Sequence, residues 1–206
     1  DKANVEMFVM SHCPYGTQIE KGMLPVLDKI GKKIDFSLKF VSYAMHGEKE
    51  VREELSQYCI EKNEPAKLAA YLQCFLADES KSAECVASTG INKANLDKCV
   101  AATDKQYKVM ASFADKSTWA NGTYPPVDMH KADNTKYGVT GSPSLVINGK
   151  LVSTGRDPQS LLNAVCAGFK TPPAECKDAL STATPSVGFG FSTANASDSA
   201  ANACGN

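Results

Sequence analysis

The alternation of hydrophobic and polar residues predicts a strand, a helix and a second strand in the first 42 residues. Residues 4–10 (NVEMFVM) form a short apolar run that is typical of a buried β-strand. Pro14 suits the first position of a helix, where no backbone N–H is needed, and the apolar residues after it recur with helical spacing. Residues 34–42 (IDFSLKFVS) alternate as in a strand. This order predicts a parallel βαβ unit.

A second group of elements is predicted near the other end of the chain. Residues 144–147 and 150–153 are typical of two short strands, and Asn148-Gly149 between them favours a type I′ hairpin turn. A helix is expected to follow, from Pro158 to Gly168. Together with the βαβ unit, these elements predict an α/β fold class.

The middle of the chain has a helical pattern. Between residues 48 and 115, apolar side chains recur at helical spacing in three stripes. We therefore expect a core of residues 1–47 and 116–178, interrupted by a helical insertion over 48–115. Residues 179–206 are rich in Ser, Ala, Gly and Asn, which is typical of a low-complexity C-terminal tail.

Composition and charge exclude several classes of function. The chain carries 22 Lys and Arg against 23 Asp and Glu, a net charge of −1, and no basic stripe favours nucleic acid or an anionic membrane. No apolar run approaches the about 18 residues of a membrane span. The sequence has no Cys-x-x-Cys pair typical of zinc and no Gly-rich phosphate loop, so we expect no metal and no cofactor. The oligomeric state is not predicted.

Eight dispersed cysteines favour structural disulfides and hence an extracytoplasmic location, whether periplasmic, secreted or lumenal. Cys59 and Cys99 lie on apolar helical stripes, and Cys74 and Cys85 flank a short polar connection. We expect the pairs Cys59–Cys99 and Cys74–Cys85, although four cysteines permit about three connectivities. Cysteines 166 and 176 close a loop that two prolines stiffen, and we expect them to pair as Cys166–Cys176.

Two cysteines then remain, Cys13 and Cys204. The tail cysteine is a possible partner of Cys13, but each is equally compatible with a free thiol, and Cys204 with an intermolecular link. The sequence leaves these alternatives open.

The stretch "SHCPYG" places Cys13 between the end of a strand and the first turn of a helix. Backbone N–H groups and the helix dipole stabilise a thiolate there, so the pKa of Cys13 should fall below the free value of about 8.5. Cys13 is therefore the candidate catalytic nucleophile. His12, Pro14, Tyr15 and Gly16 form its loop, and a positive charge on His12 would lower the pKa further.

The motif "FVMSHCPYG" after a strand, with "VTGSPSLVINGK" much later, resembles the thioredoxin-fold thiol-disulfide oxidoreductases. It is closest to the branch of DsbA-type proteins and gamma-interferon-inducible lysosomal thiol reductases. The resemblance implies a thioredoxin-like fold with a disulfide-bonded helical insertion. It also implies a cis Ser142–Pro143 bond opposite Cys13, with Ser142 offering backbone hydrogen bonds to an extended substrate.

The likeness to the lysosomal reductases extends to "MHGEKE". His46, Gly47 and Glu50 match part of a Cys-Gln-His-Gly-x-x-Glu-Cys signature, but the two signature cysteines correspond to Ala44 and Val51. The role of His46 is therefore open, and capping of the first insertion helix is favoured.

An aromatic segment precedes the Ser142-Pro143 motif. It contains Trp119, Tyr124 and His130. These side chains are compatible with the wall of a substrate groove and equally with core packing.

Gly16 replaces the second cysteine of a dithiol motif, so Cys13 has no resolving thiol in its own loop. One hypothesis is monothiol exchange, of isomerase or reductase type, in which an external thiol or redox partner protein releases a cysteine-containing protein or peptide substrate. A second hypothesis makes Cys204 a remote resolving or blocking thiol. The alternative is a non-enzymatic binding module that holds a partner segment in the groove of Cys13 and Pro143.

Overall fold

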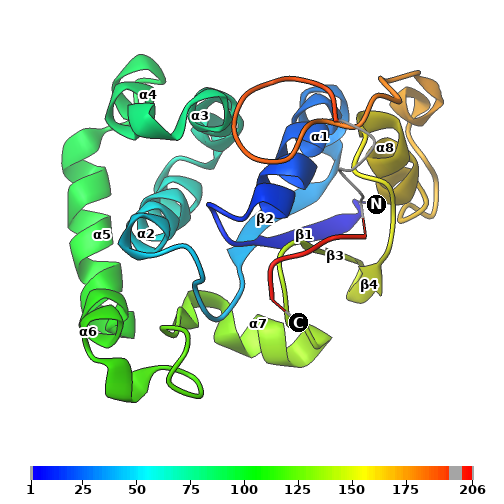
Figure 1. The fold of residues 1–206 in the computed structure, drawn as a ribbon. Coiled ribbons are helices and arrows are strands. Elements are labelled where there is room, and N and C mark those ends of the chain that lie inside the picture. The colour runs from blue at the N-terminus through cyan, green and yellow to red at the C-terminus, as the bar shows by residue number, and fades with distance from the viewer. Residues whose placement is uncertain (1, 195–200, 206) are drawn as a thin grey trace.

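A four-stranded sheet with the order β2-β1-β3-β4 lies at the centre of the molecule (Figure 1). The computed structural model describes residues 2–194 and 201–205. The strands are β1 (Asn4–Val9), β2 (Asp35–Phe40), β3 (Ser144–Ile147) and β4 (Lys150–Val152). β1 pairs with β2 in parallel and with β3 antiparallel, which confirms the predicted βαβ unit. The hairpin between β3 and β4 is also confirmed, with φ angles of 49° at Asn148 and 78° at Gly149.

Helices cover both faces of the sheet. Val5, Met7 and Val9 of β1 belong to the apolar cluster that includes α1 (Pro14–Ile30) and α8 (Pro158–Cys166). The alternate residues Phe8 and Met10 lie in a second cluster, together with Cys13 and Cys204. Because successive strand residues point to opposite faces, the second face of β1 leads directly to the candidate nucleophile. Helix α7 (Lys131–Tyr137) flanks that face and was not predicted, since it is short and has no clear apolar stripe (Figure 1).

Five helices between β2 and β3 form a group on one side of the sheet (Figure 1). They are α2 (Glu48–Asn63), α3 (Pro65–Ala77), α4 (Ser82–Ser88), α5 (Lys93–Tyr107) and α6 (Val109–Ala114). Cys59–Cys99 joins α2 to α5, and Cys74–Cys85 joins α3 to α4. Cys166–Cys176 joins α8 to the short 3₁₀ turn after it. These are the pairs expected from the cysteine positions.

The described part of the tail lies against the core. A loop closed by a bridge between Pro185 and Thr193 passes over α1 and α3 (Figure 1). The buried Lys21 ammonium of α1 donates to the carbonyl oxygens of Gly188 and Gly190, each at 2.8 Å. Polar low-complexity residues are thus held by backbone hydrogen bonds to a buried cation, a contact that composition does not indicate.

Several carboxyl groups are buried between α1 and α2. Glu20 of α1 and Glu50, Glu53 and Glu54 of α2 are at most 6% exposed. Burial raises the pKa of Glu53 to about 7, although hydrogen bonds from Tyr71 and its neighbours act in the opposite direction. The same desolvation raises the pKa values of Glu20 and Glu54 well above the ordinary value.

These carboxyls should make the protein less stable as the pH rises from acid to neutral. The folded state holds the Glu53 proton more tightly than the unfolded state, so this contribution is complete below pH 4.5 and is lost as the pH approaches 7. The loss from Glu53 is on the order of 3 kcal/mol. Glu53→Gln keeps an acceptor for Tyr71 and Gln57, which donate at 2.7 and 2.9 Å.

Urea unfolding at pH 5 and pH 8 tests this expectation. The wild type should lose more stability between the two pH values than Glu53→Gln does. Equal losses in the two proteins would show that Glu53 ionises normally in the folded state.

Candidate functional site

Cys13 is the N-cap residue of α1 and is fully buried. Its sulfur forms a disulfide with Cys204, which lies 191 residues further along the chain. The amide N–H of Gly16 points at Cys13 Sγ, with the nitrogen 3.4 Å away. The Ser142 carbonyl oxygen lies 3.5 Å from the same sulfur. The end of the tail therefore covers the sulfur that sequence reasoning identified as reactive.

The Ser142–Pro143 peptide bond is cis, and Ser142 pairs with Cys204 through the backbone. The Ser142 N–H donates to the Cys204 carbonyl at 2.8 Å, and the Cys204 N–H donates to the Ser142 carbonyl at 2.7 Å. This is the pairing of two antiparallel strands. The tail lies in the place where the family resemblance implies an extended substrate.

Gly16 and Ser142 pack directly against each other. A Cβ atom at position 16 would lie 2.7 Å from Ser142 Oγ and 3.0 Å from the Met10 carbonyl oxygen. Ser142 Oγ is itself held, because it accepts a hydrogen bond from the Met10 N–H at 2.8 Å. The space that the side chain of a second motif cysteine would enter is therefore filled by Ser142.

His12 is packed between the insertion and the tail. Its Nε2 lies 2.8 Å from Glu79 Oε2, and its ring meets the rings of Phe75 and Phe189 edge-on, each at 5.6 Å between centroids. Burial lowers the pKa of His12, although the Glu79 carboxylate acts in the opposite direction. A lowered pKa favours the neutral imidazole at neutral pH, so the positive charge considered from the sequence is disfavoured.

Two carboxyl groups of the insertion hold the backbone before Cys13. Glu54 Oε1 accepts from the Ser11 N–H at 3.1 Å, and Glu50 Oε2 accepts from the His12 N–H at 3.1 Å. Glu50 also bonds to His46 Nδ1 at 2.6 Å. Sequence reasoning noticed Glu50 through the His-Gly-x-x-Glu signature but gave it no role, and it missed Glu54, one helical turn further along the same helix.

Arg156 holds the tail on the other side of the site. Its guanidinium donates to Gln18 Oε1 at 2.9 Å and to the carbonyl oxygen of Asn202, and it lies 5.8 Å from the centroid of the Tyr15 ring. Pro14 contributes a carbonyl oxygen that accepts from the Gly188 N–H at 3.0 Å. Neither Arg156 nor Gln18 has a sequence motif that would have pointed to this contact.

The three aromatic residues singled out before the cis-proline have different surroundings. Tyr124 stacks on Tyr43, with ring centroids 5.6 Å apart, and both line a cavity of about 530 Å³ beside Gly205. Trp119 donates instead to the Ser112 carbonyl at 2.9 Å, and His130 Nδ1 accepts from the backbone N–H of a β2 residue at 3.0 Å. Only Tyr124 of the three aromatic residues therefore faces a cavity near the site.

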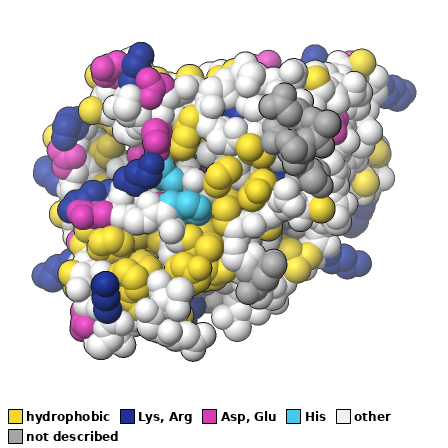
Figure 2. Space-filling view, in the orientation of Figure 1, with side chains coloured by type: hydrophobic (Ala, Val, Ile, Leu, Met, Phe, Trp, Pro, Cys, Tyr) yellow, Lys and Arg dark blue, Asp and Glu magenta, His cyan; other side chains and the backbone are white. Residues whose placement is uncertain are grey.

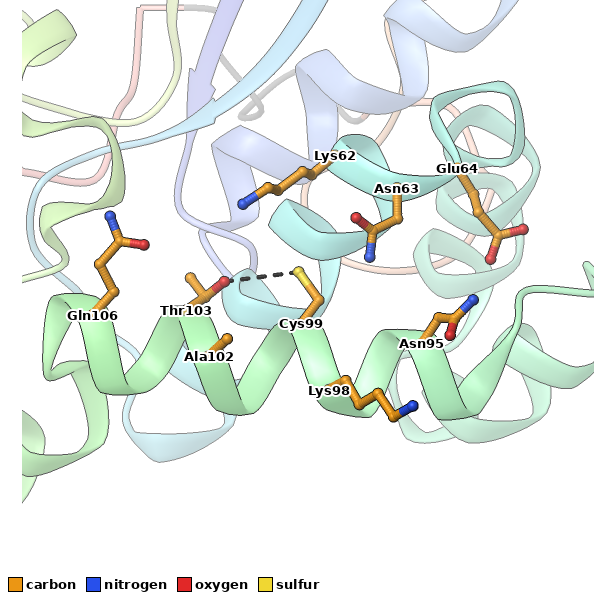
Figure 3. A pocket seen from close by; sticks show the side chains of 9 residues that line it. All are labelled: Lys62, Asn63, Glu64, Asn95, Lys98, Cys99, Ala102, Thr103 and Gln106. Carbon is orange, nitrogen blue, oxygen red and sulfur yellow. Dashed lines mark hydrogen bonds between the residues drawn. The ribbon is translucent and has the colours of Figure 1, made fainter.

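A separate cavity of about 460 Å³ lies between the end of α2 and α5 (Figure 3). Long polar side chains such as Lys62 and Lys98 line it, and Thr103 Oγ1 lies 3.7 Å from Cys99 Sγ at its wall. No residue of the Cys13 loop or of the cis-proline loop lines this cavity, so it is not part of the candidate site.

Charged side chains of both signs lie mainly along the left side and the rim of the face seen in Figure 2, and hydrophobic side chains gather in its middle and lower left. Within residues 2–194 and 201–205, no group of three His, Cys, Asp or Glu side chains is arranged to hold a metal ion. No helix among those residues is long and apolar enough to cross a bilayer.

No protein-family model and no curated protein matches the chain. Oxidised DsbA from Mycobacterium tuberculosis is similar in structure, with a TM-score of 0.55 and 15% identity over 84% of this chain and 86% of that chain. DsbG from the same organism gives 0.54 and 14%, over 84% and 81%. BdbD from Bacillus subtilis gives 0.53 and 16%, over 82% and 88%. The chain thus has a thioredoxin-like fold with a disulfide-bonded helical insertion.

The contact between Gly16 and Ser142 generates a stability prediction. Gly16→Ala should lower the free energy of unfolding by about 1–3 kcal/mol, because the new methyl group overlaps Ser142 Oγ. In a Ser142→Ala background the same change should cost less, since the hydroxyl is gone. Chemical denaturation of the four proteins measures the coupling.

Gly31→Ala is the matched control, because a Cβ there meets only Leu27, at 3.7 and 3.9 Å. The free energy of unfolding of that variant should equal or exceed that of the wild type. If Gly16→Ala were as stable as Gly31→Ala, the space opposite Ser142 would be open and its filling could not explain the absent cysteine.

Proposed function

We propose that this protein is an extracytoplasmic thiol-disulfide oxidoreductase in which Cys13 exchanges disulfides and Cys204 is its second redox-active thiol. The observation that supports this most is the Cys13–Cys204 disulfide, held where Cys204 also pairs with Ser142. All eight cysteines lie in the described residues and all are paired, which favours an oxidising compartment.

Reduction would leave Cys13 as a nucleophile. As N-cap of α1, a Cys13 thiolate would accept from the Gly16 N–H and face the positive end of the helix dipole. Both effects lower a thiol pKa below about 8.5. The Ser142 carbonyl beside the sulfur opposes this, so the predicted pKa lies between that of a free cysteine and that of a strongly activated one.

The proposed exchange between the protein and a substrate disulfide proceeds in two steps. The Cys13 thiolate attacks one sulfur of a substrate disulfide, forming a mixed disulfide, and the other substrate sulfur leaves as a thiolate. The Cys204 thiolate then attacks Cys13 Sγ, which re-forms Cys13–Cys204 and releases the reduced substrate. Two electrons pass from the cysteine pair to the substrate, and an external thiol or a redox partner protein restores the pair. The reverse sequence oxidises a substrate dithiol.

Cys204 adds a second thiol to the monothiol exchange that the sequence predicts. Gly16 still leaves the motif with one thiol, but the tail can supply the resolving sulfur that the loop lacks. When the tail is displaced, an external thiol would resolve the mixed disulfide, as in an isomerase. The binding-module alternative requires the Cys13–Cys204 disulfide to be a permanent structural bond.

Turnover of a disulfide-linked peptide with dithiothreitol as the external thiol tests this function. Cys13→Ser should reduce the catalysed rate to background. Reduced Cys204→Ser, freed of dithiothreitol and then mixed with the peptide, should accumulate a mixed disulfide between Cys13 and the peptide, visible by mass spectrometry. The double variant Cys166→Ser/Cys176→Ser removes a disulfide at α8 and should keep the wild-type rate per folded molecule.

The pH dependence of alkylation adds a direct measure of Cys13. In Cys204→Ser, the alkylation rate should rise with a midpoint below about 8.5. A midpoint at or above that value, together with wild-type turnover no faster than background, would leave only the binding module.

A further inference from the structure

The backbone after Cys204 passes between two close walls. Gly205 has a φ of 74°, a conformation that favours glycine. A Cβ atom at position 205 would overlap the hydroxyl oxygen of Tyr43 and would lie 2.9 Å from Tyr43 Cζ. Real Cβ atoms do not approach a ring this closely, so a side chain at this position requires Tyr43 to move.

Tyr43 is not free to swing aside. Its hydroxyl donates to the Thr140 carbonyl at 2.6 Å, and its ring stacks on Tyr124 at an interplanar angle of 28°. Thr140 lies two residues before Ser142, so the wall is tied to the same loop that pairs with Cys204. Contacts with the cis-proline loop and with Tyr124 therefore help to set the position of the ring.

Gly141 forms the opposite wall. A Cβ atom there would lie 2.5 Å from the Gly205 carbonyl oxygen and 2.9 Å from the Cys204 carbonyl oxygen. The two glycines thus allow two backbones to approach at the point where the chain leaves the cysteine. Gly205 itself lines the cavity of about 530 Å³, together with Tyr43 and Tyr124.

On the basis of the proposed exchange at Cys13, we infer that the site selects partners in which the reacting cysteine is followed by glycine. Tyr43 is the specificity-determining residue. A partner whose cysteine bonds to Cys13 and whose backbone pairs with Ser142 takes the place of Cys204, and a following residue on the path of Gly205 meets Tyr43 unless it is glycine. The chemistry recognised is an extended Cys-Gly unit, in a protein segment or in a small Cys-Gly thiol.

The tail itself provides the first experiment. Gly205→Ala should shift the equilibrium of the Cys13–Cys204 disulfide with dithiothreitol toward the reduced form by about tenfold or more, because the methyl group meets Tyr43. Tyr43→Ala should remove the part of that shift that comes from the ring in the double variant, leaving the about fivefold effect of an alanine in a left-handed conformation.

Gly188→Ala is the matched control. Gly188 has the same φ of 74° but no atom within 4 Å of the added Cβ, so alanine there adds left-handed backbone strain to the tail without contact with a ring. If Gly205→Ala and Gly188→Ala shift the equilibrium equally, or if Tyr43→Ala changes nothing, Tyr43 does not select glycine.

Peptides extend the test to partners. Cys204→Ser/Gly205→Ala leaves Cys13 free and disfavours return of the tail, and it can be offered Ala-Cys-Gly and Ala-Cys-Ala peptides whose cysteine carries a thionitrobenzoate group. Cys13 attacks the peptide sulfur, the mixed disulfide forms, and thionitrobenzoate leaves and absorbs light. The Gly peptide should react about tenfold faster or more, and Tyr43→Ala should reduce the ratio to about twofold or less.

The outcomes separate this inference from the function on which it rests. Equal, fast reaction of both peptides keeps Cys13 as a nucleophile and overturns the selectivity for glycine. If neither peptide reacts faster with the protein than with free cysteine, both proposals are overturned. If the preference for glycine holds in N-acetyl-Cys-Gly as well as in longer peptides, small thiols are a source of the Cys-Gly unit. If it holds in the longer peptides alone, the source is a protein segment.

Discussion

Two reciprocal backbone hydrogen bonds between Ser142 and Cys204 are the constraint on which the rest of the site depends. They hold Cys204 in an isolated antiparallel bridge beside the cis-proline loop, and this register places Cys204 within bonding distance of Cys13. Backbone pairing carries little information about side chains, so the same loop can hold a tail or a partner segment. The disulfide then adds a covalent bond between the tail and the Cys13 loop to this weak backbone pairing.

The site is supported from three directions. Glu50 and Glu54 of the insertion hold the amides before Cys13, Arg156 holds the tail beyond α8, and Lys21 holds the tail loop over α1. Ser142 contributes twice, because its backbone pairs with Cys204 and its hydroxyl fills the space opposite Gly16. The loss of a cysteine at position 16 and the presence of one at position 204 are thus features of a single packing arrangement.

Local patterns predicted most of the fold. An apolar run identified β1, alternation identified β2, Pro14 located the start of α1, and Asn148-Gly149 located the hairpin, because each depends on nearby residues. Helix α7 was missed because its seven residues carry too little periodicity. In the site, Cys13 was evident from its position between strand and helix. Gln18, Arg156 and Tyr43 were not, since their contacts join residues that lie 46 to 138 positions apart in the sequence.

The central claim is that the tail strand closes over Cys13 through an intramolecular disulfide. Peptide mapping of the native, unreduced chain tests it most directly, because trypsin cleavage after Lys2, Lys21 and Lys177 separates residues 3–21 from 178–206. An intramolecular Cys13–Cys204 disulfide gives one linked species of these two peptides from monomeric protein. Recovery of either peptide with a free thiol, or linked only between two chains, would contradict it.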